Sequence, residues 1–303
     1  MLEPRRVARD HRAVRSPPHH LVIALLSGLA ACGHPPQPVK LTLGPQRELL
    51  VQAEVNGEPA ILELDTGAST TSFVSRAKPR LHLRGFMPTA GAGAGGTLAH
   101  AGWVYITKLV IAGETLRGLG AVLLAGGGGH GAIDGLLGMD VLGDFALEVD
   151  LRAMRVVLHD RGDTSFVGPD LVATDYRALP GGQVALEVTV AGHPATAVLD
   201  LGANRTFANR RTGLAPDDDH ATISAAIGAD RNRLTFHAAS DVAIAVGPLT
   251  LEARSVWIND LPIFQTFGLA DRPALVLGTD VLAGRRIVID PFRHRVYVSR
   301  GGP

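Results

Sequence analysis

The chain contains an internal repeat. Residues 55–70 read VNGEPAILELDTGAST and align without a gap with residues 190–205, VAGHPATAVLDLGANR, at an offset of 135. A second pair of segments aligns when Gly138 is placed on Gly278, at an offset of 140, and both then continue into a stretch of alternating apolar residues. Two blocks in the same order at nearly the same offset indicate a duplicated fold, because a short loop insertion accounts for the difference.

Each half of the repeat has the same order of features: an apolar strand, an Asp-x-Gly turn, a long variable middle, an apolar run that ends in glycine, and a hairpin. The apolar residues of both hairpins alternate, which is typical of half-buried strands. Abundant glycine (36 residues) and few aromatic residues (5%) suit many short strands joined by turns. We therefore expect an all-β fold of two homologous β-barrel lobes, residues 45–160 and 183–300, related by a pseudo-two-fold axis and joined by a linker over 161–182.

The first part of the chain has the features of an export signal. Residues 1–32 begin with a basic region and continue into LVIALLSGLAA, which at eleven residues is too short to span a bilayer. The segment ends in LAAC, which resembles the bacterial lipobox, and this resemblance implies a lipid on Cys32. An ordinary signal peptide that contains a cysteine is the alternative. Residues 33–44 predict a Pro-rich tether, so we expect a lipid-anchored protein of the bacterial cell envelope, facing the periplasm or the exterior.

The composition argues against several other functions. The formal net charge is zero, which gives no basic surface for nucleic acid. Cys32 is the one cysteine, so neither an internal disulfide nor a cysteine-based metal cluster can form. The twelve histidines contain no HExxH pair, whereas zinc needs three or four convergent ligands. We expect neither a metal nor another cofactor.

Two aspartates occupy equivalent positions in the repeat. Asp65 and Asp200 each follow an apolar strand, where partial burial raises the pKa of a carboxyl group. If the lobes bring them face to face they share one proton, because two carboxylates about 3 Å apart do not both ionise readily. One group is then a base and the other an acid, so a water between them can be activated toward a peptide carbonyl.

The residues that follow each aspartate suit this arrangement. Gly67 and Gly202 allow a sharp turn that presents backbone N–H groups to the carboxylate. Thr66 offers a hydroxyl that can bond across to the opposite loop. Ala68 and Ser69 keep the space beside the carboxylate small.

The stretch ILELDTGAS at 61–69 resembles the signature of the aspartic peptidases, and most closely that of the retropepsin-like group, which includes bacterial aspartyl-protease-like lipoproteins. The segments GLLG at 135–138 and LVLG at 275–278 resemble the family's second conserved element, which supports the catalytic loop from behind. Residues 91–113 lie where the family has its flap hairpin. The resemblance covers about residues 45–300.

This resemblance implies two acid-protease-like lobes and a monomeric endopeptidase with Asp65 and Asp200 as its catalytic pair. An extended peptide substrate would lie in the cleft between the lobes and pair through its backbone. Trp103 and Tyr105 alternate in the expected flap, where they could line the cleft or pack on their own lobe.

The second loop departs from the family pattern. Leu201 stands where the family has Thr or Ser, so half of a reciprocal hydrogen bond between the loops is absent. Arg205 would hold Asp200 ionised if it reached that carboxylate. Three interpretations stay open: an active peptidase, a pseudopeptidase that binds peptide, or a catalytic first lobe that self-associates and carries an accessory second lobe. Alanine at 68 and at 203 withholds a hydroxyl from the carboxylates and predicts a working range less acidic than that of pepsin-like members.

Other aspartates have simpler expected roles. Asp140 and Asp280 each come shortly after a glycine and precede Val-Leu, which predicts helix N-caps. Asp150 and Asp290 lie between the arms of the two hairpins, which predicts turn roles. The acidic run at 217–220 is expected to be a solvated loop.

Overall fold

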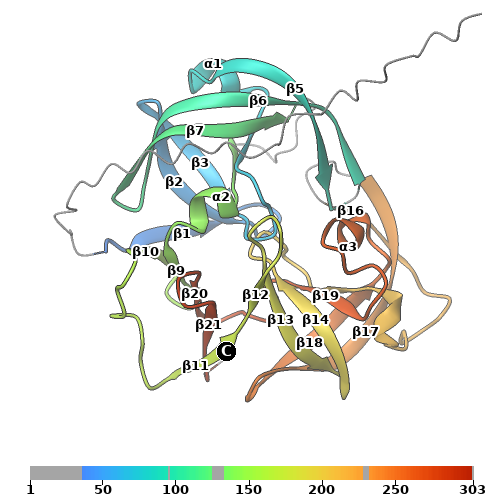
Figure 1. Ribbon diagram of the computed structural model, residues 1–303. Coiled ribbons are helices and arrows are strands. Elements are labelled where there is room, and N and C mark those ends of the chain that lie inside the picture. The colour runs from blue at the N-terminus through green and yellow to red at the C-terminus, as the bar shows by residue number, and fades with distance from the viewer. Residues whose placement is uncertain (1–35, 95, 125–132, 228–231, 302–303) are drawn as a thin grey trace, which may run out of the picture. The chain divides into compact units, whose positions relative to one another are not determined.

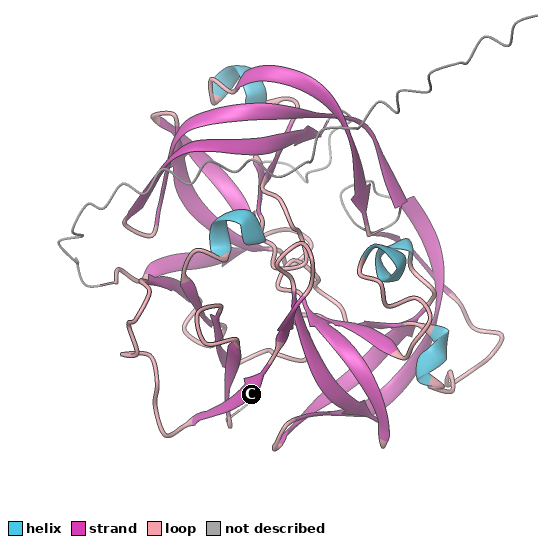
Figure 2. Cartoon of the chain, viewed as in Figure 1, coloured by secondary structure: helices cyan, strands magenta, loops and turns pink. Residues whose placement is uncertain are grey.

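The computed structural model describes residues 36–301 except residue 95, residues 125–132 and residues 228–231. The expected export signal and Cys32 lie outside the described residues, as does part of the expected tether. Strands make up most of the described chain (Figure 2), as the repeat predicted. No helix within the described ranges is long and apolar enough to cross a membrane.

The first lobe is a closed barrel of six strands, because β2 pairs with both β3 and β6 (Figure 1). β5 (Arg84–Gly93) pairs with β6 and extends this sheet beyond the barrel. The strands in order around the barrel are β2 (Leu49–Val55), β3 (Glu58–Leu64), β8 (Gly135–Leu137), β4 (Ser72–Val74), β7 (Glu114–Leu124) and β6 (Gly96–Ile111).

The second lobe is a barrel with the same topology, closed by pairing between β13 and β17. β16 (Ile223–Ile227) pairs with β17 in the position that β5 has in the first lobe. The strands in order around this barrel are β13 (Val184–Val190), β14 (His193–Leu199), β19 (Ala274–Leu277), β15 (Phe207–Ala208), β18 (Leu249–Ile258) and β17 (Asn232–Val246). The structure therefore confirms two homologous all-β lobes.

The pairing register follows the sequence repeat. In the first lobe β3 runs parallel to β8 and Leu64 pairs with Leu137. In the second lobe β14 runs parallel to β19 and Leu199 pairs with Leu277. β8 and β19 are almost entirely buried, which explains why their sequences are continuous apolar runs rather than alternating ones.

Six strands, here called the joining sheet, link the two halves of the chain and continue into the first barrel through the pairing of β1 with β2. Its strand order is β11-β21-β20-β9-β10-β1, and the pair β9–β20 at its centre links one hairpin from each half. The strands are β11 (Leu171–Asp175), β21 (Arg295–Ser299), β20 (Arg286–Asp290), β9 (Ala146–Asp150), β10 (Arg155–His159) and β1 (Val39–Leu43). The segment expected as a linker, 161–182, thus contributes β11 to this sheet and β12 (Arg177–Ala178) to the second barrel.

Short helices complete the fold. They are α1 (Ala77–Arg80), α2 (Met139–Leu142), the 3-10 helix η1 (Arg210–Thr212) and α3 (Pro262–Thr266). The turn roles of Asp150 and Asp290 are confirmed, because each Oδ1 accepts hydrogen bonds from the backbone N–H groups two and three residues later. Asp217 in the acidic run accepts hydrogen bonds from the backbone and hydroxyl of Ser240.

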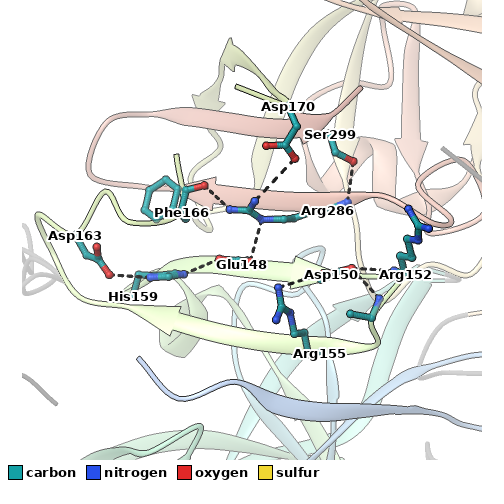
Figure 3. A network of polar contacts seen from close by, with 11 residues as sticks. Glu148, Asp150, Arg152, Arg155, His159, Asp163, Phe166, Asp170, Arg286 and Ser299 are labelled. Carbon is teal, nitrogen blue, oxygen red and sulfur yellow. Dashed lines mark hydrogen bonds and ion pairs between the residues drawn. The ribbon is translucent and has the colours of Figure 1, made fainter. Parts of the chain in front are cut away.

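A buried ionic network reinforces the joining sheet (Figure 3). His159 on β10 lies between Glu148 Oε2 and Asp163 Oδ2, with both N···O distances at 2.8 Å. Arg286 on β20 lies 2.9 Å from Glu148 Oε1, so the network crosses from one half of the chain to the other. Asp170 at 3.9 Å from Arg286 adds a second carboxylate. Because both ring nitrogens of His159 face carboxylates, the imidazolium form is the one that this site satisfies.

The network predicts a stability that depends on pH. Burial lowers the pKa of His159, but the hydrogen bonds to Glu148 and Asp163 outweigh burial and the pKa is raised overall. The pKa of Glu148 is lowered, because its bond to His159 and the charge of Arg286 outweigh burial. The pKa of Asp163 is also lowered, first by the hydrogen bond from the backbone N–H of Ser165 and then by the bond to His159. The His159 contribution is therefore complete below the unfolded pKa of about 6.5 and is lost as pH rises through the raised folded pKa. The carboxylate contribution is lost as pH falls through the lowered pKa values.

We expect His159→Gln to lower the free energy of unfolding by about 3 kcal/mol near pH 5.5, because it breaks a buried ion pair. The difference from the unsubstituted protein should shrink as pH rises toward 9. Chemical unfolding at a series of pH values measures this, with the exposed His193→Gln as the matched control. A difference that stays constant over the whole range would show that packing, not charge, is what His159 contributes.

Candidate active site

Asp65 directly follows β3 and Asp200 directly follows β14, so the two aspartates lie at equivalent ends of equivalent strands. The backbone N–H of Asp65 donates to Leu137 O at 3.1 Å, and that of Asp200 donates to Leu277 O at 3.0 Å. Each aspartate is therefore fixed by the last residue of the strand that runs parallel to its own. This is the support expected from the segments 135–138 and 275–278.

Backbone amides of the same turn hold one oxygen of each carboxyl group. Asp65 Oδ1 accepts from Gly67 N at 3.0 Å and from Ala68 N at 2.9 Å. Asp200 Oδ1 accepts from Gly202 N at 2.8 Å and from Ala203 N at 3.2 Å. The two turns thus orient their carboxyl groups in the same way.

The carboxyl groups of Asp65 and Asp200 approach each other closely enough for each to shift the pKa of the other. Gly67 and Gly202 make this approach possible, because each lies against the opposite aspartate. A Cβ at Gly67 would lie 2.3 Å from Asp200 Oδ2, and a Cβ at Gly202 would lie 2.6 Å from Asp65 Cγ. These two positions therefore need glycine for close approach.

Burial raises the pKa of both carboxyl groups, and their mutual interaction makes the two unequal. The pKa of Asp65 is raised well above its ordinary value, first by burial and then by the charge of Asp200. Burial also raises the pKa of Asp200, but hydrogen bonds from Gly202, Ala203, Asp65 and Gly67 oppose the rise. These directions favour a proton on Asp65 and an ionised Asp200.

Thr66 joins the two loops from one side. Its buried hydroxyl donates to Leu199 O at 2.9 Å and accepts from Leu201 N at 2.9 Å. Leu201 is also buried, and its side chain packs in the core because it has no hydroxyl to return the bond. The cross-loop bond expected of Thr66 is thus present in one direction.

Two further threonines, one in each lobe, anchor the aspartate loops to their own lobes. Thr71 donates through its hydroxyl and its N–H to Asp140 Oδ1 at 2.8 Å, and its hydroxyl accepts from Gly138 N. Thr206 makes the equivalent bonds with Asp280 and Gly278. The helix N-cap prediction for Asp140 was therefore wrong, since Gly138 is the N-cap residue of α2 and Asp140 bonds to the aspartate loop instead.

Sequence reasoning missed Thr71 and Thr206, although the repeat contained the signal. The offset of 135 aligns these two threonines, and the offset of 140 aligns their partners Asp140 and Asp280. A polar pair kept in both halves beside a buried loop indicates a hydrogen bond between its members.

Arg205 does not reach the aspartates. Its guanidinium lies over the ring of Trp257, 5.7 Å from the centroid, and makes no ion pair with Asp200 in the described structure. The condition under which Arg205 would hold Asp200 ionised is therefore not met. The neighbouring Asn204 donates instead to Gln46 O at 2.6 Å, which ties the second loop to the first lobe.

A cavity of about 550 Å³ opens above the two carboxyl groups. Residues 89–91 with Gly93 and Ala94 of the β5–β6 hairpin line it, as does Trp103. The hairpin begins at Arg84, earlier than the 91–113 expected for the flap. Helix α3 of the second lobe contacts β5 (Figure 1), so both lobes enclose the cavity. Tyr105 does not line it and is about half exposed.

Comparison with known families agrees with this geometry. Residues 51–141 match the family model described as aspartyl protease. This match supports an aspartyl protease of the retropepsin-like family. The matched range runs from β2 through Asp65 and the flap to α2, and the second lobe repeats its topology outside that range. A search of curated proteins found no match.

Within the described ranges, no group of three or more His, Cys, Asp or Glu side chains is arranged to hold a metal ion. Among the residues predicted for the site, the structure brings together Asp65, Gly67 and Ala68 with Asp200, Gly202 and Ala203, and Thr66 with Leu201. Ser69 is exposed at the rim of the cavity, with its hydroxyl 3.5 Å from that of Thr70.

The structure predicts that Thr66→Val separates the two loops. The substitution keeps the shape of the side chain but leaves Leu199 O and Leu201 N without their buried partner, at a cost of about 1–3 kcal/mol in the free energy of unfolding. Urea unfolding measures the loss, and Thr42→Val on an exposed position of β1 is the control, expected to be nearly neutral. Equal effects of the two substitutions would mean that the cross-loop bond contributes nothing.

Proposed function

We propose that the protein is an aspartic endopeptidase in which Asp65 and Asp200 activate a water molecule. The observation that carries this proposal is the pair of carboxyl groups held against each other beside a cavity that residues of both lobes line. The aspartyl protease domain supports protease activity in general.

The unequal protonation assigns the two roles. Asp200, as the ionised member, takes a proton from the water while its oxygen attacks the peptide carbonyl carbon, and Asp65 gives its proton to the carbonyl oxygen. In the tetrahedral intermediate, Asp200 then passes its new proton to the leaving nitrogen, and a hydroxyl of the intermediate returns a proton to Asp65. The C–N bond breaks, and the pair regains its starting state without a covalent intermediate.

The substrate would be an extended peptide between the flap hairpin and the dyad. An extended peptide can pair its backbone with strand edges, and side chains then enter the cavity alternately. A monomer has both lobes and both aspartates, so it needs no second copy for this chemistry.

A pseudopeptidase that binds peptide is the second candidate, and Leu201 is the observation that favours it. With Thr66 as the one hydroxyl between the loops, the dyad has less cross-loop support than the family pattern provides. Asp140 and Asp280 still hold each loop within its own lobe, which favours the active enzyme.

We expect Asp65→Asn and Asp200→Asn each to lower kcat for peptide cleavage by at least about 10²–10⁴-fold, since each removes one proton-transfer group. The assay uses the chain without its expected export signal, a diverse peptide mixture and mass spectrometry, with the loop variant Asp218→Asn as control. If Asp65→Asn alone abolishes cleavage, the second lobe is accessory. If the unsubstituted protein cleaves nothing at any pH while it binds peptides, the pseudopeptidase is the correct interpretation.

The raised pKa values predict the pH range of activity. The base Asp200 must be ionised, so kcat rises as pH increases through the lower pKa of the pair. The acid Asp65 must be protonated, so kcat falls as pH increases through its raised pKa. Because both shifts are upward, the bell-shaped profile should be centred above the ordinary aspartate range. A profile confined below about pH 4 would contradict this assignment.

The cellular site is part of the same proposal. A lipid on Cys32 would tether the enzyme to the bacterial cell envelope, with its cavity open to peptides in the periplasm or outside the cell. Labelling with a fatty-acid probe in a bacterial host should tag the full chain and not the Cys32→Ala variant. Equal labelling of the full chain and of Cys32→Ala would show that Cys32 is not the site of lipid attachment.

A further inference from the structure

The cavity beside the dyad is strongly acidic. Glu48 and Glu63 line it together with Asp65 and Asp200, which places four carboxyl groups in one enclosed space. None of the described residues that line the cavity is Lys, Arg or His. A substrate cation that enters this cavity therefore meets carboxyl groups and no cationic side chain of the described lining.

Glu63 is placed to meet a substrate next to the reacting bond. It precedes Asp65 by two residues on β3, so both side chains lie on the same face, about 7 Å apart along the strand. Within the described part of the chain Glu63 makes no hydrogen bond or ion pair, and its pairing neighbours across the sheet are Leu50 and Leu136. The carboxyl group is therefore half-buried, has no partner among the described residues and lines the cavity.

The neighbouring Glu48 adds a second carboxyl group to this part of the cavity. Its side chain is buried, and Oε2 accepts from Gln46 N at 2.7 Å, which fixes its position. Burial raises the pKa of Glu63 to about 9, and the charges of Asp65, Glu48 and Asp200 add to the rise. These three are the charged groups that act on Glu63, and all are acidic.

The second lobe shows that the fold does not require these glutamates. The offset of 135 places Val198 opposite Glu63 and Gln183 opposite Glu48 in the repeat. Val198 is fully buried in its barrel, and Gln183 donates to Gly67 O at 3.3 Å. The second-lobe side of the cavity is instead apolar, with Phe207 and Val276 in its lining.

We propose that Glu63, together with Glu48, forms a subsite that selects a Lys or Arg side chain on one of the two substrate residues flanking the scissile bond. The inference rests on the proposed peptidase function for the position of that bond. The cation would supply the partner that Glu63 lacks, and a buried carboxylate is stable when it is paired in this way. The apolar second-lobe side would hold the residue across the bond.

Binding of the cation is coupled to loss of a proton. Below about pH 9 the free protein holds Glu63 protonated, so a basic side chain must displace that proton to form an ion pair. Affinity for a basic peptide should therefore rise as pH increases from 6 toward 9, by up to about tenfold per pH unit for one proton released. A matched neutral peptide should lack this slope.

The test compares peptides that differ at one position. In each peptide, one of the two residues that flank the cleaved bond is Lys, Arg, norleucine or Glu. The value of kcat/KM is measured for the unsubstituted protein, for Glu63→Gln and for Glu63→Val. Valine is chosen because Val198 occupies the equivalent position in the second lobe. Glu58→Gln at the exposed start of the same strand is the control. We expect an advantage of Lys or Arg over norleucine of about 10–100-fold at one of the two positions. Both Glu63 variants should lose that advantage and still cleave the norleucine peptide, whereas Glu58→Gln should retain it.

A binding experiment separates this inference from the proposed function. Peptides with an uncleavable hydroxyethylene unit in place of the bond, carrying Lys or norleucine, are titrated into the same variants. If the protein cleaves peptides without preferring a basic residue, the subsite is wrong and the peptidase function is right. The same conclusion follows if the preference for a basic residue persists in Glu63→Val. A Lys preference in binding that depends on Glu63, without cleavage of any peptide, would overturn the peptidase and support the subsite. Equal binding of both peptides, or binding of neither, would overturn the subsite.

Discussion

Two carboxyl groups held against each other at the ends of buried strands are the constraint on which the rest of the molecule depends. Their approach requires glycine at 67 and 202, because each glycine lies where a side chain would displace the opposite aspartate. It also requires each loop to be fixed within its own lobe, which the bonds of Thr71 and Thr206 accomplish. Since these anchors are present in both lobes, the absence of a hydroxyl at Leu201 removes one cross-loop bond and leaves the loops in place.

The main features of the fold could be predicted because the sequence repeat contains each of them in both halves. A strand, an Asp-x-Gly turn and a Gly-terminated apolar run in each half indicate two equivalent barrels, and the structure has them in matching registers. The facing aspartates follow from the same symmetry, since equivalent residues near a two-fold axis meet. The turns at Asp150 and Asp290 were readable because their side chains bond to backbone only two and three residues away.

Contacts between distant segments were harder to predict, because local pattern does not specify a partner. Asp140 fitted a helix start, yet it bonds to Thr71, which lies 69 residues earlier. Arg205 follows the second aspartate closely, but the ring of Trp257 offers its guanidinium a different neighbour. The joining sheet, with its network around His159, depends on hairpins from opposite halves meeting edge to edge. The acidity of the cavity came from Glu63, which in sequence looks like the polar member of an ordinary strand.

The central claim is that Asp65 and Asp200 share one proton, and a carboxyl titration measures this directly without requiring activity. The protein is labelled with ¹³C at the Cγ of aspartate, so that glutamate carboxyl groups give no labelled signal, and its NMR spectrum is recorded between pH 3 and 9. The signals of Asp65 and Asp200 are assigned with the variants Asp65→Asn and Asp200→Asn. We predict two separate steps, with Asp65 protonated well above the ordinary aspartate range and both signals shifting at each step. Two carboxyl groups that ionise independently, both near pH 4, would contradict the account.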